Sequence, residues 1–401
     1  MWIGQVGSLL GDWFNTVAVL SLLLRLTGSG RAAGLYYVMQ MLPVFVASPL
    51  AGRVVDRLPR KAVMIGADLG RAAVVLALLL VSRRDQIWIV YAATALQMTL
   101  SAFFEPARTA VTPGLVRADH LVAANSLTAV TWSTMLSLGA VVGGAVAAVF
   151  GERVAFLANS ASYLWSAAFV ARAHFPPVVP HTEAVGRGFL AGLTQALRSP
   201  NLLPVLCVKG LLGLSGGIAL VLAVFAERIY RVGTSAAGGI GLLFGARGLG
   251  TAIGPVIARR LAAASGRPAR RAILAGFFVS SAAFLAGCLL RPLPLVLAAM
   301  VLSGIGTSIA WVFSTVVLQT ETTDALRGRV FAAEQALLTL GVSLSMVGTG
   351  HWLDRPGTSP RTVGAGLALI YAATGAVFAL LVSRAERASR VTPGNGTFPA
   401  P

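Results

Sequence analysis

Asp12, Asp68 and Glu105 are acidic residues that lie inside apolar stretches of this 401-residue chain. In a bilayer an ionised carboxylate is costly, so each needs a cationic partner, water or a bound proton. Asp12 has no basic residue one helical turn away on either side. It is therefore our first candidate for a proton-binding residue. The alternative is an ion pair across the bundle with Lys209 or Arg247, two bases in apolar stretches that could instead bind an anionic group.

The other two acids each have an arginine three residues further along the chain. Side chains at i and i+3 are neighbours on a helix, so Asp68 can pair with Arg71, and Glu105 with Arg108. Both acids remain proton-coupling candidates, with a structural ion pair as the alternative. Glu105 also lies near the end of its apolar stretch, where it could reach Arg57.

A short charged segment separates the apolar stretches 34–51 and 62–81, and its sequence is Gly52-Arg53-Val54-Val55-Asp56-Arg57-Leu58-Pro59-Arg60-Lys61. Gly52 allows helices to approach closely, and Asp56 can cap the N-terminus of a neighbouring helix. The bases Arg57, Arg60 and Lys61 hold the segment at the membrane surface. A single acid among four bases favours a gating role; a plain cationic anchor is the alternative.

Sequence patterns typical of enzymes and metal sites are absent. Neither lysine follows a glycine and precedes Ser or Thr, no histidine has metal-ligand spacing, and there is no Gly-x-Ser-x-Gly turn. We therefore expect no enzyme, no cofactor and no metal. The formal net charge of +18 does not indicate nucleic acid, because the basic residues fall in short gaps between apolar stretches.

The composition indicates a membrane protein, since 56% of residues are hydrophobic and 11% are charged. A soluble chain carries about twice that charged fraction, and a membrane-spanning helix needs about 20 apolar residues. Twelve such stretches are present: 2–26, 33–52, 62–82, 86–112, 123–149, 154–171, 201–227, 235–258, 270–290, 293–318, 330–353 and 363–383.

The longest gap between stretches, 172–200, is rich in proline and glycine and predicts the boundary between two six-helix bundles. We expect an N-terminal bundle over 1–171, a cytoplasmic linker over 172–200, a C-terminal bundle over 201–383 and a cytoplasmic tail over 384–401. Within the linker, 189–197 forms either a short interfacial helix or an early start of the seventh helix. The first stretch, with no basic region before it, is expected to stay as a membrane helix.

The distribution of basic residues predicts the orientation. With the N-terminus inside, cytoplasmic segments hold roughly twice as many Lys and Arg residues as outer loops. Both termini are therefore expected in the cytoplasm. Gly254-x-x-x-Ala258-Arg259 after the eighth stretch repeats part of the charged segment after the second, and such internal symmetry is typical of transporters built from two similar bundles.

The charged segment resembles the loop 2–3 signature of the major facilitator superfamily, with Gly52, Asp56, Arg57, Arg60 and Lys61 at its five positions. Further matches, in the family's order, resemble its drug:proton antiporter branch, which includes macrolide-efflux and enterobactin-exporter-like proteins. They are Gly11-Asp12-Trp13, Leu26-Thr27-Gly28-Ser29, Asp68-Leu69-Gly70-Arg71-Ala72, Pro106-Ala107-Arg108, Ala124-Asn125-Ser126-Leu127 and Arg327-Gly328-Arg329-Val330-Phe331. Gly139-Ala140-Val141-Val142-Gly143-Gly144 resembles the branch's helix-five signature, but Ala140 replaces its proline; ordinary small-residue packing is the alternative.

The resemblance implies an all-α polytopic membrane protein with twelve helices in two pseudo-symmetric six-helix bundles. It also implies alternating access, gating by Asp56 and Arg57, and export of a small organic molecule coupled to proton entry. An importer, or a lipid or siderophore transporter of the same fold, is the alternative. We expect a monomer in the cell membrane, with the substrate, protons and the bilayer as partners. Polar and aromatic candidates for the central cavity are Asp12, Asn15, Gln97, Ser101, Ser215 and Trp311, with helix packing as the alternative.

Overall fold

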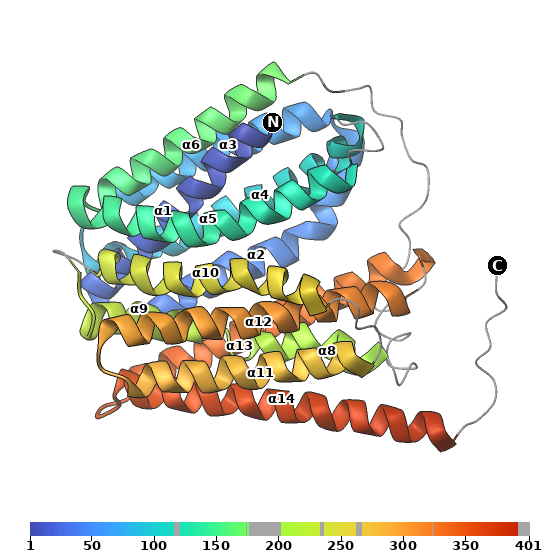
Figure 1. The fold of residues 1–401 in the computed structure, drawn as a ribbon. Coiled ribbons are helices and arrows are strands. Elements are labelled where there is room, and N and C mark those ends of the chain that lie inside the picture. Colours follow the sequence, from blue (N-terminus) through green and yellow to red (C-terminus); the bar gives the residue numbers. More distant parts are fainter. Residues whose placement is uncertain are drawn as a thin grey trace.

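The computed structural model describes residues 1–115, 121–173, 175, 202–232, 236–261, 267–322 and 324–391, and every regular element in them is helical (Figure 1). The elements before the long gap are α1 (Trp2–Thr27), α2 (Gly30–Arg57), α3 (Arg60–Leu76), the 3-10 turns η1 (Ala77–Leu80) and η2 (Arg84–Gln86), α4 (Ile87–Leu115), α5 (Leu121–Phe150) and α6 (Glu152–Arg172). Those after it are α8 (Leu202–Gly213), α9 (Ile218–Arg228), α10 (Ala237–Leu261), α11 (Arg267–Leu289), α12 (Leu293–Glu321), α13 (Asp324–Leu353) and α14 (Pro360–Val391).

Each of the twelve predicted stretches coincides with helix in this structure, most of them within a few residues at each end. Among the described residues, ten spans are long and apolar enough to cross a bilayer, and α5 contributes a shorter apolar run. Large apolar side chains such as Leu80, Trp88, Val149 and Leu344 are exposed on the surface of the bundle. The fold is therefore that of an all-α polytopic membrane protein. The predicted interfacial helix at 189–197 lies outside the described residues.

The charged segment differs from the expected loop, because α2 continues through it to Arg57 and α3 begins at Arg60. Only Leu58 and Pro59 connect the two helices. Leu58 is extended, with φ −104° and ψ 153°, as expected for a residue before proline. We call this end of the molecule the Pro59 end, and the opposite end the Asp354 end, after a residue in the α13–α14 connection.

The seventh predicted span is two helices, α8 and α9, with a turn between Gly213 and Ile218. Ser345 of α13 satisfies the interrupted backbone: its hydroxyl donates to the Leu214 carbonyl at 2.6 Å and accepts the Gly217 N–H at 2.9 Å. Such breaks persist in a bilayer where protein groups bind the freed backbone atoms. A Cβ on Gly217 would lie 2.1 Å from the Thr349 hydroxyl oxygen, so glycine lets α13 approach closely.

The helices form two packed groups, one from α1 to α6 and one from α8 to α14 (Figure 1). The groups meet where α5 packs on α10 and where α2 packs on α13. At the first contact, a Cβ on Gly144 of α5 would lie 2.7 Å from the Ala237 carbonyl oxygen and 2.8 Å from the Gly241 Cα of α10. Gly139 and Gly143 instead pack on Trp13 and Phe14 of α1. The helix-five glycines thus serve close packing, both within a group and between groups.

Candidate functional site

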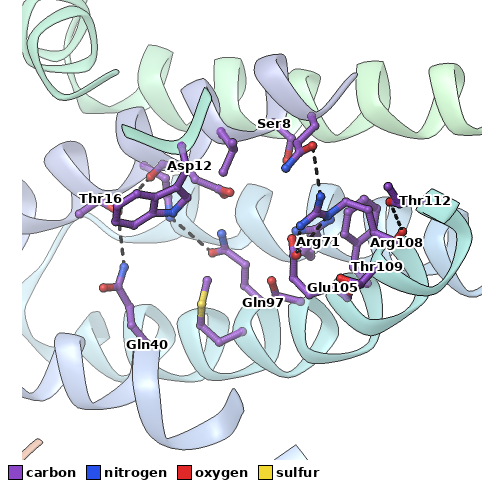
Figure 2. A pocket seen from close by; sticks show the side chains of 17 residues that line it. Ser8, Asp12, Thr16, Gln40, Arg71, Gln97, Glu105, Arg108, Thr109 and Thr112 are labelled. Carbon is purple, nitrogen blue, oxygen red and sulfur yellow. Dashed lines mark hydrogen bonds and ion pairs between the residues drawn. The ribbon is translucent and has the colours of Figure 1, made fainter. Parts of the chain in front are cut away.

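A cavity of about 540 Å³ lies among the helices of the first group (Figure 2). Its polar lining comes mainly from α1 and α4, and it extends from the middle of α1 to the Pro59 end. Figure 2 shows Asp12 and Gln97 beside the cavity, with Glu105 and Arg108 toward one end of it. The described residues that line it are Gln5, Ser8, Leu9, Asp12, Asn15, Thr16, Gln40, Arg71, Gln97, Met98, Ser101, Phe104, Glu105, Arg108, Thr109, Thr112 and Trp132.

Asp12 ends a chain of hydrogen bonds that crosses this group of helices. The Tyr163 hydroxyl of α6 donates to the Asp12 carboxylate and accepts from Gln97 Nε2 at 2.7 Å. Asn15 Nδ2 in turn donates to Gln97 Oε1 at 3.4 Å. In the described residues Asp12 forms no ion pair, so the alternative pair with Lys209 or Arg247 is not found there. The structure therefore places beside a cavity a carboxylate that has a hydroxyl partner and no ion pair among the described residues, with Arg71 lining the same cavity.

Asp68 and Arg71 form the predicted intrahelical ion pair, and both side chains are almost fully buried. The Arg71 guanidinium also lies over two aromatic rings, 4.4 Å from the Tyr163 ring centroid and 4.6 Å from that of Phe104. Cation–π contacts of this kind are strongest where water is excluded. Arg71 thus connects Asp68 to the tyrosine that holds Asp12.

Glu105 and Arg108 form the second predicted pair, with 2.7 Å between the carboxylate and the guanidinium. Arg108 also contacts Gln5 Oε1 at 3.4 Å, which ties α4 to the start of α1. In the described residues Glu105 pairs with Arg108 and not with Arg57. Because the Glu105 side chain is 52% exposed, this acid has access to water that Asp68 lacks.

A second cavity, of about 390 Å³, lies between the two groups of helices. It shares the polar residues Asp12, Thr16 and Gln40 and the apolar residues Leu9, Met98 and Trp132 with the first cavity, and its lining is mainly apolar. Its remaining described lining is Trp13, Tyr37, Met41 and Leu136 from the first group, and Ala219, Phe244, Arg247, Gly248 and Thr251 from the second. Asp12 therefore faces both cavities.

The second group has its own buried ion pair, between Lys209 of α8 and Glu334 of α13 at 2.8 Å. The Lys209 ammonium also lies 4.6 Å from the centroid of the Trp311 ring. The partner of Lys209 is thus an acid of its own group and not a carboxylate of the first. Ser215 lies in the turn between α8 and α9 and donates to the Leu212 carbonyl at 2.6 Å. Ser215 and Trp311 are outside the described lining of both cavities.

The predicted gating residues lie near the α2–α3 connection. Lys61 donates to the Ala173 carbonyl at the end of α6 at 2.9 Å and lies 5.8 Å from the Phe175 ring centroid, so it joins α3 to α6. Arg57 is exposed. The surroundings of Gly52 and the side chain of Asp56 lie outside what the structure describes.

At the Asp354 end, one carboxylate joins the two groups of helices. Asp354 accepts from the Ser29 hydroxyl and the Gly30 N–H, each at 2.6 Å, and from the Arg31 N–H at 3.1 Å. These donors form the N-terminus of α2, where the helix dipole also favours an anion. Burial raises the pKa of Asp354, but the hydrogen bonds outweigh it and hold the pKa below its ordinary value. Arg228 adds a bond to the Gly28 carbonyl at 3.0 Å.

Three residues of these clusters were not predicted from the sequence: Tyr163, Glu334 as the partner of Lys209, and Asp354. Tyr163 contacts Asp12 across 151 positions, and Lys209 contacts Glu334 across 125. No local spacing signals such contacts. The available signal is a polar residue within an apolar stretch, which Tyr163 and Glu334 both provide.

A family model described as transmembrane secretion effector matches residues 1–395. The chain belongs to this family of major facilitator superfamily transporters. It is 27% identical to the uncharacterized MFS-type transporter YfiS of Bacillus subtilis, covering 91% of this chain and 89% of the relative. The enterobactin exporter EntS of Escherichia coli O1:K1 / APEC is 26% identical, covering 94% of this chain and 89% of EntS. Macrolide efflux protein A of Streptococcus pyogenes is 35% identical over 123 residues, 30% of each chain.

Solved structures confirm the fold of this family member. A bacterial homologue of the iron transporter ferroportin, in an inward-facing state, superposes with a TM-score of 0.73 at 17% identity, covering 96% of this chain and 97% of the other. The chain is therefore a multi-span membrane transporter with the major facilitator fold, as its loop 2–3 signature predicts.

Proposed function

We propose that this transporter exports a small organic molecule in exchange for protons, and that Asp12 is the proton-binding residue. The observation that carries the proposal is the position of Asp12, a carboxylate that forms no ion pair with the described residues and lines both cavities. A carboxylate at such a site alternates between a bound proton and another ligand. Efflux by relatives named as exporters of macrolides and enterobactin supports the outward direction.

The orientation follows from charge, with the Pro59 end and both termini in the cytoplasm. The hydrogen bonds of Asp354 join the two groups of helices at one end, while the first cavity extends to the Pro59 end. A transporter in this conformation would receive its substrate from the cytoplasm. In the exchange cycle Asp56 and Arg57 would latch the Pro59 end when the Asp354 end opens. Each proton entering the cell supplies about 2.3 kcal/mol per 100 mV of membrane potential.

Inverted membrane vesicles carrying the protein test this proposal. Ethidium should accumulate inside energised vesicles, and a protonophore should prevent it. Asp12→Asn should abolish the proton-dependent accumulation while the protein stays in the membrane. Asp85→Asn is a matched control, because Asp85 is an exposed acid paired only with Arg83 at the other end, and it should transport normally.

Two results would contradict the proposal. Undiminished proton-driven accumulation by Asp12→Asn would remove Asp12 from the coupling step. Movement of ethidium out of the inverted vesicles, against the expected direction, would identify an importer.

A further inference from the structure

The described lining of the cavity between the two groups of helices has one positive and one negative side chain, which limits the kind of substrate that fits it. Among its described lining residues Arg247 is the single cation and Asp12 the single carboxylate. Arg247 belongs to α10 of the second group and Asp12 to α1 of the first. They form no ion pair with each other in the described structure, so two opposite charges face one cavity from opposite walls.

Part of the Arg247 guanidinium lacks a hydrogen-bond partner in the described structure. Its Nη2 donates to the Thr307 hydroxyl at 3.3 Å, whereas its Nη1 is buried and has no hydrogen-bond partner within the described structure. A buried guanidinium without an anionic partner is expensive, and its planar donors match a carboxylate or a similar acidic group. Such a residue is expected to have a ligand outside the protein chain.

The buried acids Glu334 and Asp12 each have another partner. Glu334, the buried acid of the same group, holds Lys209 at 2.8 Å. Asp12 accepts from the Tyr163 hydroxyl in the first group. No carboxylate of the described residues forms an ion pair with Arg247, which distinguishes it from the paired bases Arg71 and Lys209.

The walls between the two charges are aromatic and apolar. Trp13, Trp132 and Phe244 line the cavity with Met41 and Met98. Flat aromatic walls and flexible methionines suit a ring-containing or otherwise apolar body. A ligand that satisfies both charges and these walls carries an acidic group and a basic group on one apolar frame.

We infer that the substrate is an amphiphilic zwitterion, with its acidic group bound by Arg247 and its basic group directed to Asp12. The inference rests on the proposed function and deepens it. A cationic group on the substrate and a proton compete for Asp12, as proton exchange requires. Arg247 then selects acid-bearing molecules from the wider set of amphiphilic cations.

A pair of dyes tests this selection: a rhodamine with a free benzoate, and the methyl ester of the same dye. The first is a zwitterion and the second a cation of nearly equal shape. Binding is measured by fluorescence anisotropy with the purified full chain in phosphatidylcholine nanodiscs. The wild type should bind the free acid more tightly than the ester. Arg247→Gln should weaken acid binding about tenfold to a hundredfold and leave the ester nearly unchanged.

Two further variants serve as controls for the effect of Arg247→Gln on dye binding. Arg247→Lys retains the charge without the planar donors, so it should recover part of the preference for the acid. Arg291→Gln removes an exposed arginine between α11 and α12 and should change neither affinity. Thermal unfolding of each variant shows whether it is folded.

Equal binding of both dyes by the wild type would overturn the inference, as would an equal loss of both in Arg247→Gln. Displacement of the acid dye by added phosphatidylglycerol would assign Arg247 to a lipid phosphate and also overturn it. None of these results alters proton-driven ethidium transport in vesicles. Loss of proton dependence in that assay would overturn the proposed function and leave the dye preference measurable.

Discussion

Tyr163 contacts both Asp12 and Arg71. Its hydroxyl donates a hydrogen bond to the Asp12 carboxylate, and the Arg71 guanidinium lies over its ring. One aromatic side chain therefore joins the candidate proton site to the buried Asp68–Arg71 pair. Its two roles use different atoms, the hydroxyl for Asp12 and the ring face for Arg71. They can be separated by substitution.

Tyr163→Phe removes the hydroxyl and keeps the ring. We expect proton-driven transport to fall about tenfold or more, since a hydrogen bond to a charged group is worth about 1.5–3 kcal/mol. The thermal unfolding temperature should change little. Tyr163→Leu removes the ring as well and should lower both transport and the unfolding temperature. Equal transport by Tyr163→Phe and the wild type would show that the hydroxyl does not act on Asp12.

Asp68→Asn leaves the Arg71 guanidinium buried without its acid. Breaking a buried ion pair in this way costs about 3–5 kcal/mol, so unfolding in dodecyl sulfate micelles should begin at a much lower detergent fraction. Glu105→Gln breaks a pair whose acid is half exposed, and it should cost about 1 kcal/mol or less. If both variants were destabilised equally, burial of the first pair would not determine its contribution.

Residue spacing predicted part of this site. The i,i+3 pairs at Asp68 and Glu105 are local, and the structure has both. The absence of bases one turn from Asp12 also correctly left it unpaired within its helix. The partners Tyr163 and Glu334 come from distant helices, so their identity depends on tertiary packing that spacing does not encode.

At the scale of elements, the helix ends at the Asp354 end join the two groups in addition to the α5–α10 and α2–α13 contacts. Gly28 ends α1 in the left-handed conformation, with φ 62°, and Ser29 then caps α2. This tight reversal presents the Ser29 hydroxyl and the N–H groups of Gly30 and Arg31 to Asp354. The contact thus depends on three residues between and at the start of two helices, and on one acid from the opposite group.

Asp354→Asn removes the charge and one good acceptor from this contact. We expect the Asp354 end to open, which spin labels at Arg153 and Arg291, on opposite groups, would report as a longer distance. Asp85→Asn, at an exposed acid of the same end, should leave the distance unchanged. A distance unaffected by Asp354→Asn would show that other contacts hold this end closed.

The pH dependence of this contact follows from the lowered pKa of Asp354. A carboxyl with a depressed pKa in the folded form stabilises it above its ordinary pKa of about 3.9, and the contribution is lost as pH falls through the depressed value. The label distance should therefore stay constant between about pH 7 and about pH 5. Opening within that range would contradict the hydrogen-bond assignment.

Gly144→Ala places a methyl group against the backbone of α10, where the nearest atom is 2.7 Å away. Overpacking of this kind costs about 1–3 kcal/mol, so the unfolding temperature should fall. Gly348→Ala on α13 adds the same group where nothing lies within 4 Å, and it should be neutral or stabilising. The same unfolding temperature for both variants would indicate that α5 and α10 are not tightly packed.

Helix positions were predictable because every membrane span needs a long apolar run, and such runs can be identified from the sequence. The break between α8 and α9 was not predicted, because the stretch is apolar on both sides of it; Ser215, Gly216 and Gly217 are its local signal, and Ser345 of another helix supplies the compensating hydrogen bonds. The α2–α3 connection was expected to be longer, since charged residues suggested a loop. Arg57 and its neighbours extend α2 instead, and Pro59 ends it.

At the scale of the whole molecule, two groups of helices share Asp12 and Arg247 across one cavity. Asp354 joins the two groups at one end, and the larger cavity extends to the Pro59 end. In the proposed cycle the Asp354 end opens as the Pro59 end closes. We propose that substrate and proton compete for Asp12 during that cycle.

Proton release on ligand binding tests this claim most directly. Ethidium is added to the purified protein in weakly buffered solution with a pH-sensitive dye, near pH 6. The wild type should release protons as ethidium binds, and Asp12→Asn should release none while Asp85→Asn behaves like the wild type. Ethidium binding without proton release in the wild type, or unchanged release in Asp12→Asn, would contradict the assignment of Asp12 as the shared site.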